Sequence, residues 1–401
     1  MSRLAMTLIV VLTSQVSYAE SWTLNLSAGK YDRHDTPVSV RLPDFAPNLS
    51  TFQLIDAETN QTIPVQISAK NPVATWILKR PLKAKHQREY ILHASEAAPN
   101  KNQTAAVQCS QKDGHLLISV GNRTVLQYNM AVNQAPDGLE EIQSRNAYIH
   151  PVFTPNGKMI TDDFAPDHPH QRGIFFAWTK SLFNGKDINF WEVQQGVGRI
   201  EFERLDSTTD GSVYGEATIK QRFLDVRQPD QPIEILSETW TIRVFNISDG
   251  FLFDLQSDQV CTATTPLVIG PYHYGGLGVR GRREWLAPNP DFEMITSNGF
   301  DRIRGNHTRP QWVDFGDSLA GMTSLDHPDN FRFPQPVRLH PKKPYFCFAP
   351  LVVGQFEIGP QQMFRSKYRF HVYDGAKATA RNERIWADYA TPPDVSVTVQ
   401  P

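Results

Sequence analysis

Short runs of alternating apolar and polar residues fill the first part of the chain. The runs lie at 38–42, 52–55, 63–67, 74–78 and 88–92. Alternation with a period of two is the pattern of half-buried β-strands, and polar turns such as 56–60 separate the runs. Short strands divided by turns are typical of a β-sandwich. We therefore expect residues 20–98 to form a small β-sandwich accessory domain.

Longer alternating runs follow. A hairpin is predicted at 115–128 around Gly121-Asn122, and a second strand pair at 214–226 and 233–245 continues into 251–255. Strands of ten or more residues exceed the usual length and favour wide, curved sheets. The only helix predicted after the N-terminal segment is 378–389, before Pro392-Pro393. The pattern predicts an all-β protein: residues 99–107 are a linker, and 108–401 form a large antiparallel β-sandwich domain that carries the site.

The N-terminal segment has the features of a secretory signal. Arg3 precedes an apolar run at 5–12, and Ser17-Tyr18-Ala19 places small residues where signal peptidase reads them. The apolar run is shorter than the roughly 20 residues that a membrane-spanning helix needs. We expect a cleaved signal peptide at 1–19, a secreted or periplasmic protein, and no membrane insertion.

Charge and cysteine content narrow the partners. The formal net charge is −2 with both signs interspersed, which argues against a nucleic-acid partner. The three cysteines are far apart in the sequence and lack the spacing of a zinc ribbon; they are Cys109, Cys261 and Cys347. We expect buried thiols, and a single disulfide between two of them is the alternative. Aromatic residues make up 11% of the chain. Flat aromatic faces suit a carbohydrate partner.

Several motifs resemble a bacterial family of unknown function that carries the label "methane oxygenase PmoA". The matching segments are Y-I-H-P-V-F-T-P-N-G (148–157), D-H-P-H-Q-R-G-I-F-F-A-W (167–178), D-I-N-F-W-E (187–192), E-T-W-T-I-R (238–243), Y-H-Y-G-G-L-G-V-R (272–280), S-L-D-H-P-D-N-F-R-F-P (324–334) and Y-R-F-H-V-Y-D-G (368–375). The label does not fit, because the methane monooxygenase subunit of that name crosses the membrane several times. The resemblance implies a galactose-mutarotase-like supersandwich among exported sugar-processing proteins, and such a fold does not by itself choose a reaction.

The segment 167–173 is the strongest candidate for chemistry. This segment and the residues around it are rich in proline and glycine, so the sequence predicts mostly loop here. His168 and His170 flank Pro169 and are the first catalytic candidates, because imidazole titrates near neutrality. Arg172 offers a planar fork for a carboxylate or hydroxyls. The alternative is a structural loop in which the histidines bond to backbone carbonyls.

Two further segments supply candidates. Glu192 follows Trp191, and a carboxyl group against an aromatic wall can act as a general acid; alternatively, Trp191 is core and Glu192 pairs with an arginine. Tyr272, His273 and Tyr274 precede a glycine-rich stretch. An extended backbone would set His273 opposite both tyrosines, and the alternative is a glycine-permitted bend in a sheet.

These residues give a working scheme. One of His168 and His170 removes a proton, and His273 or Glu192 protonates the leaving oxygen. The expected substrate-binding residues are His150, Arg172, Tyr272, Tyr274, Arg280 and His327. His327 could equally belong to a turn capped by Asp and Asn. We expect His150, His168, His170, Arg172 and His273 to converge on one cleft of the large sandwich, and residues 20–98 to pack on it through a modest interface.

The predicted function is that of an exported carbohydrate-active enzyme, a lyase or glycoside hydrolase with histidine-centred acid–base chemistry. No cofactor is required. A divalent metal held by His168 and His170, with His150 or His273 and a carboxylate such as Asp163 or Glu192, is the competing possibility. The alternatives are a non-catalytic carbohydrate-binding protein and a metal-dependent hydrolase or oxidase.

Overall fold

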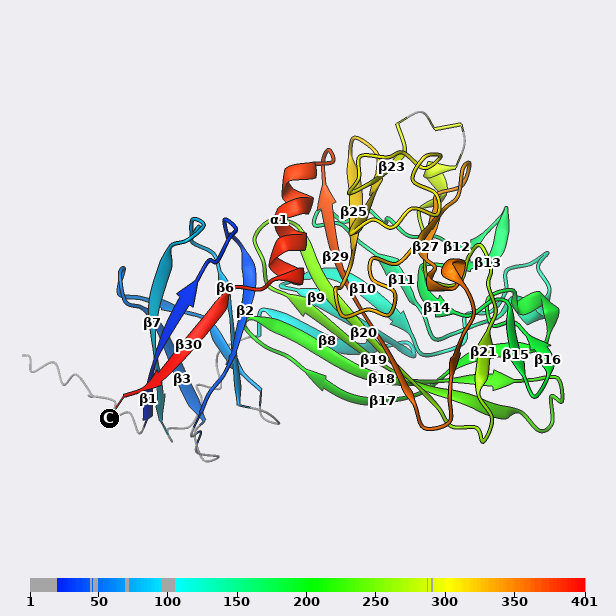
Figure 1. Ribbon diagram of the computed structural model, residues 1–401, viewed down its shortest axis with the longest axis horizontal. Helices are drawn as coiled ribbons and strands as arrows, with labels where there is room; N and C mark the ends of the chain where they lie inside the picture. Colours follow the sequence, from blue (N-terminus) through cyan, green and yellow to red (C-terminus); the bar gives the residue numbers. More distant parts are fainter. Residues whose placement is uncertain are drawn as a thin grey trace, which may run out of the picture.

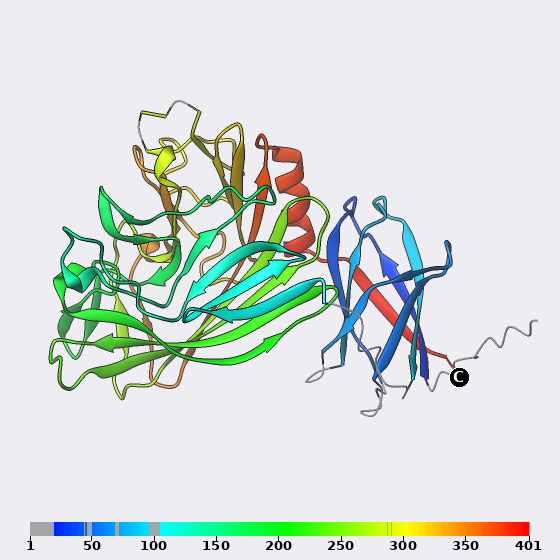
Figure 2. The ribbon, with the colours of Figure 1, turned by 180° about the vertical axis from the view of Figure 1, so that it is seen from behind.

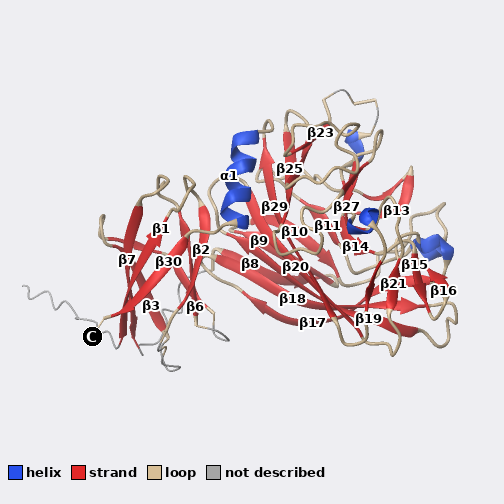
Figure 3. Cartoon of the chain, viewed as in Figure 1, coloured by secondary structure: helices blue, strands red, loops and turns tan. Residues whose placement is uncertain are grey.

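The computed structural model describes residues 20–43, 45, 50–68, 72–95, 105–286, 288–289 and 291–400. The predicted signal peptide at 1–19 and most of the predicted linker lie outside the described residues. The regular structure is nearly all strand (Figure 3), arranged as a small sandwich beside a large one (Figure 1). The predicted fold class, an all-β chain with a large antiparallel sandwich preceded by a small one, is confirmed.

The small sandwich consists of two sheets. The first has the order β30 (Asp394–Val399), β1 (Glu20–Ser27), β7 (Gln87–Ser95), β3 (Thr51–Asp56) and β4 (Gln61–Ile63). The second has the order β2 (Thr36–Arg41), β6 (Val73–Leu78) and β5 (Val65–Ile67). The inward side chains of both sheets, including the buried Trp22 and Trp76, share one apolar core. Burial alternates along β1 as a half-buried strand requires, whereas β6 is buried along nearly its whole length.

The last strand of the chain belongs to this small sandwich. Strand β30 pairs antiparallel with β1, from Trp22 opposite Val399 to Ser27 opposite Asp394. It is the red strand among the blue ones in Figure 1. The predicted large domain at 108–401 is thus wrong at its C-terminal end. The alternating sequence of β30 explains the pairing, because Val395 and Val397 pack against the small core.

The large sandwich is built on two eight-stranded sheets. One has the order β17 (Gly198–Thr209), β18 (Tyr214–Asp225), β19 (Ile233–Phe245), β20 (Phe251–Cys261), β29 (Met363–Asp374), β25 (Ala320–Asp326), β24 (Trp312–Gly316) and β23 (Glu293–Thr296). The other has the order β26 (Val337–Leu339), β27 (Tyr345–Phe348), β22 (Gly276–Arg280), β14 (Ile174–Ala177), β11 (Ile149–Val152), β10 (Arg123–Asn129), β9 (His115–Val120) and β8 (Val107–Lys112). Buried side chains of both sheets form one continuous core.

Smaller elements complete the large sandwich. A four-stranded sheet contains β16 (Lys186–Ile188), β15 (Ser181–Phe183), β21 (Leu267–Ile269) and β28 (Phe356–Ile358), and a hairpin is formed by β12 (Asp163–Ala165) and β13 (His168–Arg172). The helices are η1 (Glu141–Gln143), η2 (Val193–Gln195), η3 (Arg283–Trp285), η4 (Pro350–Val353) and α1 (Thr379–Ala390). The predicted helix and the predicted β9–β10 hairpin are confirmed, the latter with Arg123 opposite Val120.

Helix α1 lies where the two sandwiches meet, in both views of the chain (Figures 1 and 2). The buried Arg33 of the small sandwich forms an ion pair with the buried Asp388 of α1, at 2.9 Å between Nη1 and Oδ1. Ile77 packs in an apolar cluster with side chains of the large sandwich such as Val213 and Ile385. A cavity of about 280 Å³ opens at the same contact. The two sandwiches are therefore joined by buried charge and apolar packing as well as by the chain.

Two global features bear on the sequence predictions. Cys109, Cys261 and Cys347 are all free thiols. Of the helices in the described ranges, none is long and apolar enough to cross a membrane.

Candidate functional site

The predicted histidine loop is an ordered hairpin. Strand β13 runs through Pro169 and pairs with β12, with Ala165 opposite His168 and Asp163 opposite Arg172. At its end Gly173 lies against β11: a Cβ built there would stand 1.9 Å from the carbonyl oxygen of Ile149. Only a glycine allows this approach, so the hairpin is fixed on the sheet and its side chains are held in place.

His168 is held by a carboxylate. Its Nδ1 lies 2.9 Å from Oδ2 of Asp167. Burial raises the pKa of Asp167, but the hydrogen bonds from Arg280 and His168 outweigh burial and hold that pKa well below its usual value. An ionised carboxylate only accepts hydrogen bonds, so Nδ1 of His168 carries a proton. In the neutral ring, Nε2 is then left with its lone pair. The imidazole is oriented as a base.

Two more imidazoles surround His168. The ring centroids of His170 and His340 lie 5.5 and 6.0 Å from that of His168. Burial, followed by the positive charges nearby, lowers the pKa of both His170 and His340 to about 4. Both rings are therefore neutral at pH 7.

His340 has the opposite tautomer to His168. Its Nδ1 accepts hydrogen bonds from the backbone N–H groups of Lys342 and Lys343, at 3.1 and 3.0 Å. A neutral imidazole whose Nδ1 accepts must carry its proton on Nε2. Sequence reasoning missed His340. The signal that could have found it is the His-Pro dipeptide, which occurs at His340-Pro341 as it does at His168-Pro169.

The two predicted substrate-binding arginines are buried, not presented to solvent. Arg280 is 0% exposed; its Nη2 and Nη1 donate to Asp167 at 2.6 and 3.1 Å, and Nη1 also donates to Gln171 at 2.9 Å. Arg280 therefore positions Asp167, and the substrate contact expected of it stays a prediction. Asp167 also forms an ion pair with Lys343, whose Nζ lies 3.3 Å from Oδ2 of Asp167.

Arg172 is the other buried arginine, at 2% exposure. Its guanidinium lies over the rings of Tyr148 and Phe175, at 5.7 and 5.3 Å. Burial lowers its pKa to about 10. Its Nε and Nη2 have no hydrogen-bond partner in the described part of the chain. Arg172 is thus buried beside aromatic rings, where an exposed fork was expected, and its direct contact with a substrate stays a prediction.

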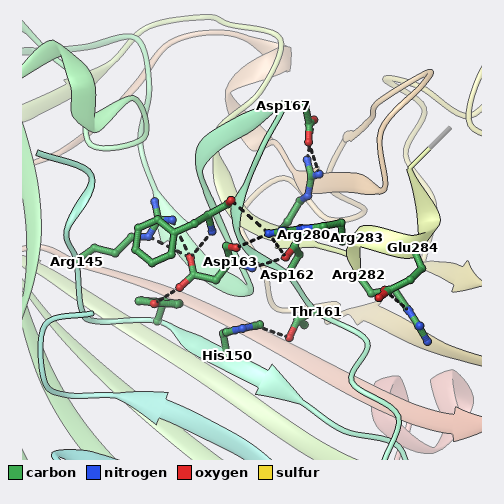
Figure 4. A network of polar contacts seen from close by, with 12 residues as sticks. Arg145, His150, Thr161, Asp162, Asp163, Asp167, Arg280, Arg282, Arg283 and Glu284 are labelled. Atoms are coloured by element: carbon green, nitrogen blue, oxygen red, sulfur yellow. Dashed lines mark hydrogen bonds and ion pairs between the residues drawn. The ribbon is translucent and has the colours of Figure 1, made fainter. Parts of the chain in front are cut away.

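The carboxylates of Asp162 and Asp163 are already paired with arginines (Figure 4). Asp163 accepts from Nε and Nη2 of Arg145 at 3.1 and 2.7 Å and from the Tyr148 hydroxyl. Asp162 pairs with Arg283 at 3.2 Å. His150 lies beside this network, with Nδ1 2.9 Å from the Thr161 hydroxyl, and burial lowers its pKa.

An aromatic group forms the other end of the site. The rings of Tyr272, His273 and Tyr274 are in mutual contact, with centroids 4.3 to 4.9 Å apart, so His273 does not oppose the tyrosines as predicted. The backbone there bends and is not a strand. The Tyr274 hydroxyl donates to Glu192 at 2.5 Å, so Glu192 pairs with a tyrosine where an arginine was the alternative. Trp191 is core, as that alternative held.

A row of ring contacts connects the two ends. The pairs are His168–His340 at 6.0 Å, His340–Tyr345 at 6.4 Å, Tyr345–Trp191 at 5.8 Å and Trp191–Tyr274 at 5.4 Å. His273 is exposed. Partial desolvation of its ring is the first cause that lowers its pKa, and the positive charge of Arg338 is the second. The same two causes lower the pKa of His340. His168 and His170 are thus neighbours, while His273 lies at the far end of the row. A single shared cleft stays a prediction.

His327 lies elsewhere. Its ring contacts Tyr389 at 4.8 Å, and its Nδ1 accepts from the backbone N–H of Asp329 at 3.0 Å. Burial, followed by the positive charge of Lys367, lowers the pKa of His327. These contacts agree with the alternative of a turn after β25, and a role for His327 in substrate binding stays a prediction.

The competing metal site would need three or four ligands around one point. Among the described residues, no group of three or more His, Cys, Asp or Glu side chains is arranged to hold a metal ion. His168 is held by Asp167, and Asp163 is taken by Arg145 and Tyr148. The proposed ligands do not gather around one point.

The sequence was then compared with known proteins. The model of a family of unknown function (DUF6807) matches residues 115–387. The chain belongs to this family. The matched region begins with β9 and ends within α1, so it contains the hairpin, the aromatic group and His340, and it leaves out the first eight strands and β30.

No curated protein matches the sequence. Among solved structures, the chain is similar to an alpha-mannosidase from Enterococcus faecalis V583, with a TM-score of 0.39 and 10% identity over 95% of this chain and 46% of the mannosidase chain. It is also similar to a galactose mutarotase related enzyme from Lactobacillus acidophilus, with a TM-score of 0.34 and 9% identity over 68% of this chain and 100% of that one. The chain spans less than half of the mannosidase chain. At these TM-scores neither similarity carries an argument about function.

Proposed function

We propose that this protein is an exported carbohydrate-active enzyme, a lyase or a glycoside hydrolase, that works by histidine-centred acid–base chemistry. The observation that carries the proposal is the Asp167–His168 pair, which leaves Nε2 of His168 as an oriented base. Export rests on the predicted signal peptide. The methane oxygenase label is a misnomer in this proposal, since an oriented imidazole base suits proton transfer.

Each part of the site has a role in this reaction. Asp167 fixes the tautomer of His168 and stabilises the imidazolium that forms when the base takes a proton. Arg280 and Lys343 hold Asp167 in place. Tyr272 and Tyr274 offer rings against which a sugar face can pack. Glu192 and His273 lie beside these rings, at the other end of the row of ring contacts from His168, so in this proposal the leaving oxygen takes its proton from His168. No step needs a cofactor.

An activity screen tests the proposal. Purified protein is offered acidic and neutral polysaccharides, and both unsaturated products and new reducing ends are measured, with and without chelator. His168→Gln should lower turnover by about 10² to 10⁴-fold, the usual contribution of a positioned general base. His86→Gln, an exposed histidine of the small sandwich, is the matched control. Full activity in His168→Gln would refute the proposal.

Two outcomes would favour the other classes. Loss of activity on chelation, restored by added metal, would establish a metal-dependent enzyme. Tight binding of a sugar with no turnover would favour a carbohydrate-binding protein that uses the aromatic group of Tyr272, His273 and Tyr274.

A further inference from the structure

The histidine cluster contains two imidazoles with opposite roles. His168 presents Nε2 as an acceptor, since its Nδ1 proton is used on Asp167. His340 presents Nε2–H as a donor, since its Nδ1 accepts two backbone N–H groups. The two ring centroids are 6.0 Å apart and the rings are inclined at 69°. A base and a neutral hydrogen-bond donor therefore lie on neighbouring rings.

The same region holds positive charge without a partner. The three carboxylates of the network are each paired: Asp162 with Arg283, Asp163 with Arg145 and Asp167 with Arg280. That leaves Arg172 with no carboxylate and with two buried N–H groups that bond to nothing among the described residues.

Two further cations stand beside His340. Arg338 is half-buried, and its Nη1 donates to the neutral amide of Asn306 at 3.2 Å. Lys343 has 28% of its side chain exposed and shares Asp167 with Arg280. Both cations act on the His340 ring. Buried or half-buried cations in excess of carboxylates attract an anionic ligand, because burial of unpaired charge is costly.

We propose that the substrate is an acidic sugar, a uronate, and that the reaction is β-elimination with His168 as the base. This inference rests on the proposed function and selects one substrate class and one reaction within it. The carboxylate of the uronate lies between Arg338, Lys343 and Nε2–H of His340, within the positive field of Arg172.

The steps balance without a further reactant. Nε2 of His168 removes the proton on the carbon next to the carboxylate, and Asp167 stabilises the imidazolium. The electron pair of that C–H bond moves toward the carboxylate, where the cations and the His340 donor stabilise the developing negative charge. A neutral histidine donor of this kind is known chemistry for an enolate. The pair then forms the C=C bond, the C–O bond to the leaving sugar breaks, and the departing oxygen takes the proton from His168.

Hydrolysis fits the same residues less well. Glycoside hydrolysis generally uses two carboxyl groups, one of which attacks the sugar or activates water. Here Asp162, Asp163 and Asp167 each accept from arginine, and Asp167 serves His168. A single oriented imidazole with surplus positive charge matches elimination, which needs a base and neutralisation of the substrate carboxylate.

The experiment compares polygalacturonate, alginate and hyaluronan with carboxyl-reduced polygalacturonate, using the full-length mature protein. The expected result is an absorbing unsaturated product from at least one acidic polymer, and at least a 100-fold lower rate on the carboxyl-reduced polymer. Reducing ends formed without unsaturated product, or equal rates on the reduced polymer, would overturn the inference and leave the proposed function standing. No turnover of any acidic or neutral carbohydrate would overturn both.

Variants of His340 and Arg338 test the assigned roles. His340→Leu should lower kcat by about 10² to 10³-fold, as the loss of a donor to developing charge does, while His340→Gln, which keeps an N–H donor, should recover at least 10-fold of that loss. Arg338→Gln should raise KM for the acidic polymer more than it lowers kcat. Arg304→Gln, an exposed arginine, is the control for general charge. Equal activity of His340→Leu and the unmodified protein would overturn the role of His340.

Discussion

Arg33→Met is expected to destabilise the whole chain far more than a surface ion pair would. Arg33 is 1% exposed and donates to Asp388 Oδ1 at 2.9 Å. It also donates to the carbonyl oxygens of Ala28, Ala387 and Thr391, at 2.9, 3.2 and 2.7 Å. Methionine keeps the apolar stem but loses these contacts and leaves Asp388 buried without its main partner.

The magnitude follows from burial. Removing one partner of a buried pair costs about 3 to 5 kcal/mol, because the remaining charge is uncompensated. The matched control is Lys83→Met, which breaks the Lys83–Asp32 pair of the same sandwich at 2.7 Å, with side chains 74% and 56% exposed. An exposed pair contributes about 0 to 1 kcal/mol. The contrast between the two variants is therefore the measured quantity.

Urea unfolding followed by two probes, one for each sandwich, is the assay. Burial raises the pKa of the Asp388 carboxyl group even with Arg33 present. Replacing Arg33 should raise the pKa of Asp388 further. A carboxyl group with a raised folded pKa costs stability above that pKa, so the penalty of Arg33→Met should shrink as the pH is lowered. A midpoint shift no larger than that of Lys83→Met, or a penalty independent of pH, would refute the buried-pair reasoning.

Three other outcomes are expected. Burial lowers the pKa of the fully buried His371 to about 4, so the unfolded chain binds this proton before the folded chain does as the pH falls. The free energy of unfolding should therefore drop between about pH 6.5 and 4. His371→Gln should remove about 3 kcal/mol of that drop, as measured by urea titrations at several pH values. A truncated protein that starts at Ala106 should aggregate in gel filtration, because β30 and Asp388 lose their partners. A protein that starts at Ala106 and also ends at Thr391 lacks β30 and should be more soluble. Equal behaviour of the two proteins would contradict the pairing of β30. Gly173→Ala should displace the hairpin from β11, since its Cβ would lie 1.9 Å from the Ile149 carbonyl oxygen; near-normal turnover and thermal stability in this variant would show that the approach is looser.

The sequence predicts the strands better than it predicts their partners. Alternation located β9, β10, β18 and β19 because each buries one face on the common core. It could not place β30, because alternation predicts a strand with one buried face but does not say which sheet the strand joins. In the structure β30 follows α1, and Asp388 of α1 bonds to Arg33 of the small sandwich, a contact between residues 355 positions apart.

The loop predicted from local composition is a hairpin in the structure. Proline and glycine predicted a loop, but Pro169 lies in a two-stranded ribbon, where an edge position tolerates the missing N–H. Burial of Arg172 and Arg280 was equally hidden, since a charged residue in a motif is read as exposed. His340 follows His168 by 172 positions in a lysine-rich turn, and only the pairing of β26, β27 and β22 brings it near.

The burial of Arg280 explains how one fold can keep a carboxylate, a base and unpaired cations together. Arg280 ends β22 and holds Asp167 with two N–H groups, so Asp167 stays ionised although it is largely buried. An ionised Asp167 fixes the proton of His168 on Nδ1 and leaves Nε2 free. Because Arg280 neutralises Asp167, the charge of Arg172 stays uncompensated. The same pairing therefore creates the base and preserves the positive field that an anionic substrate would complete.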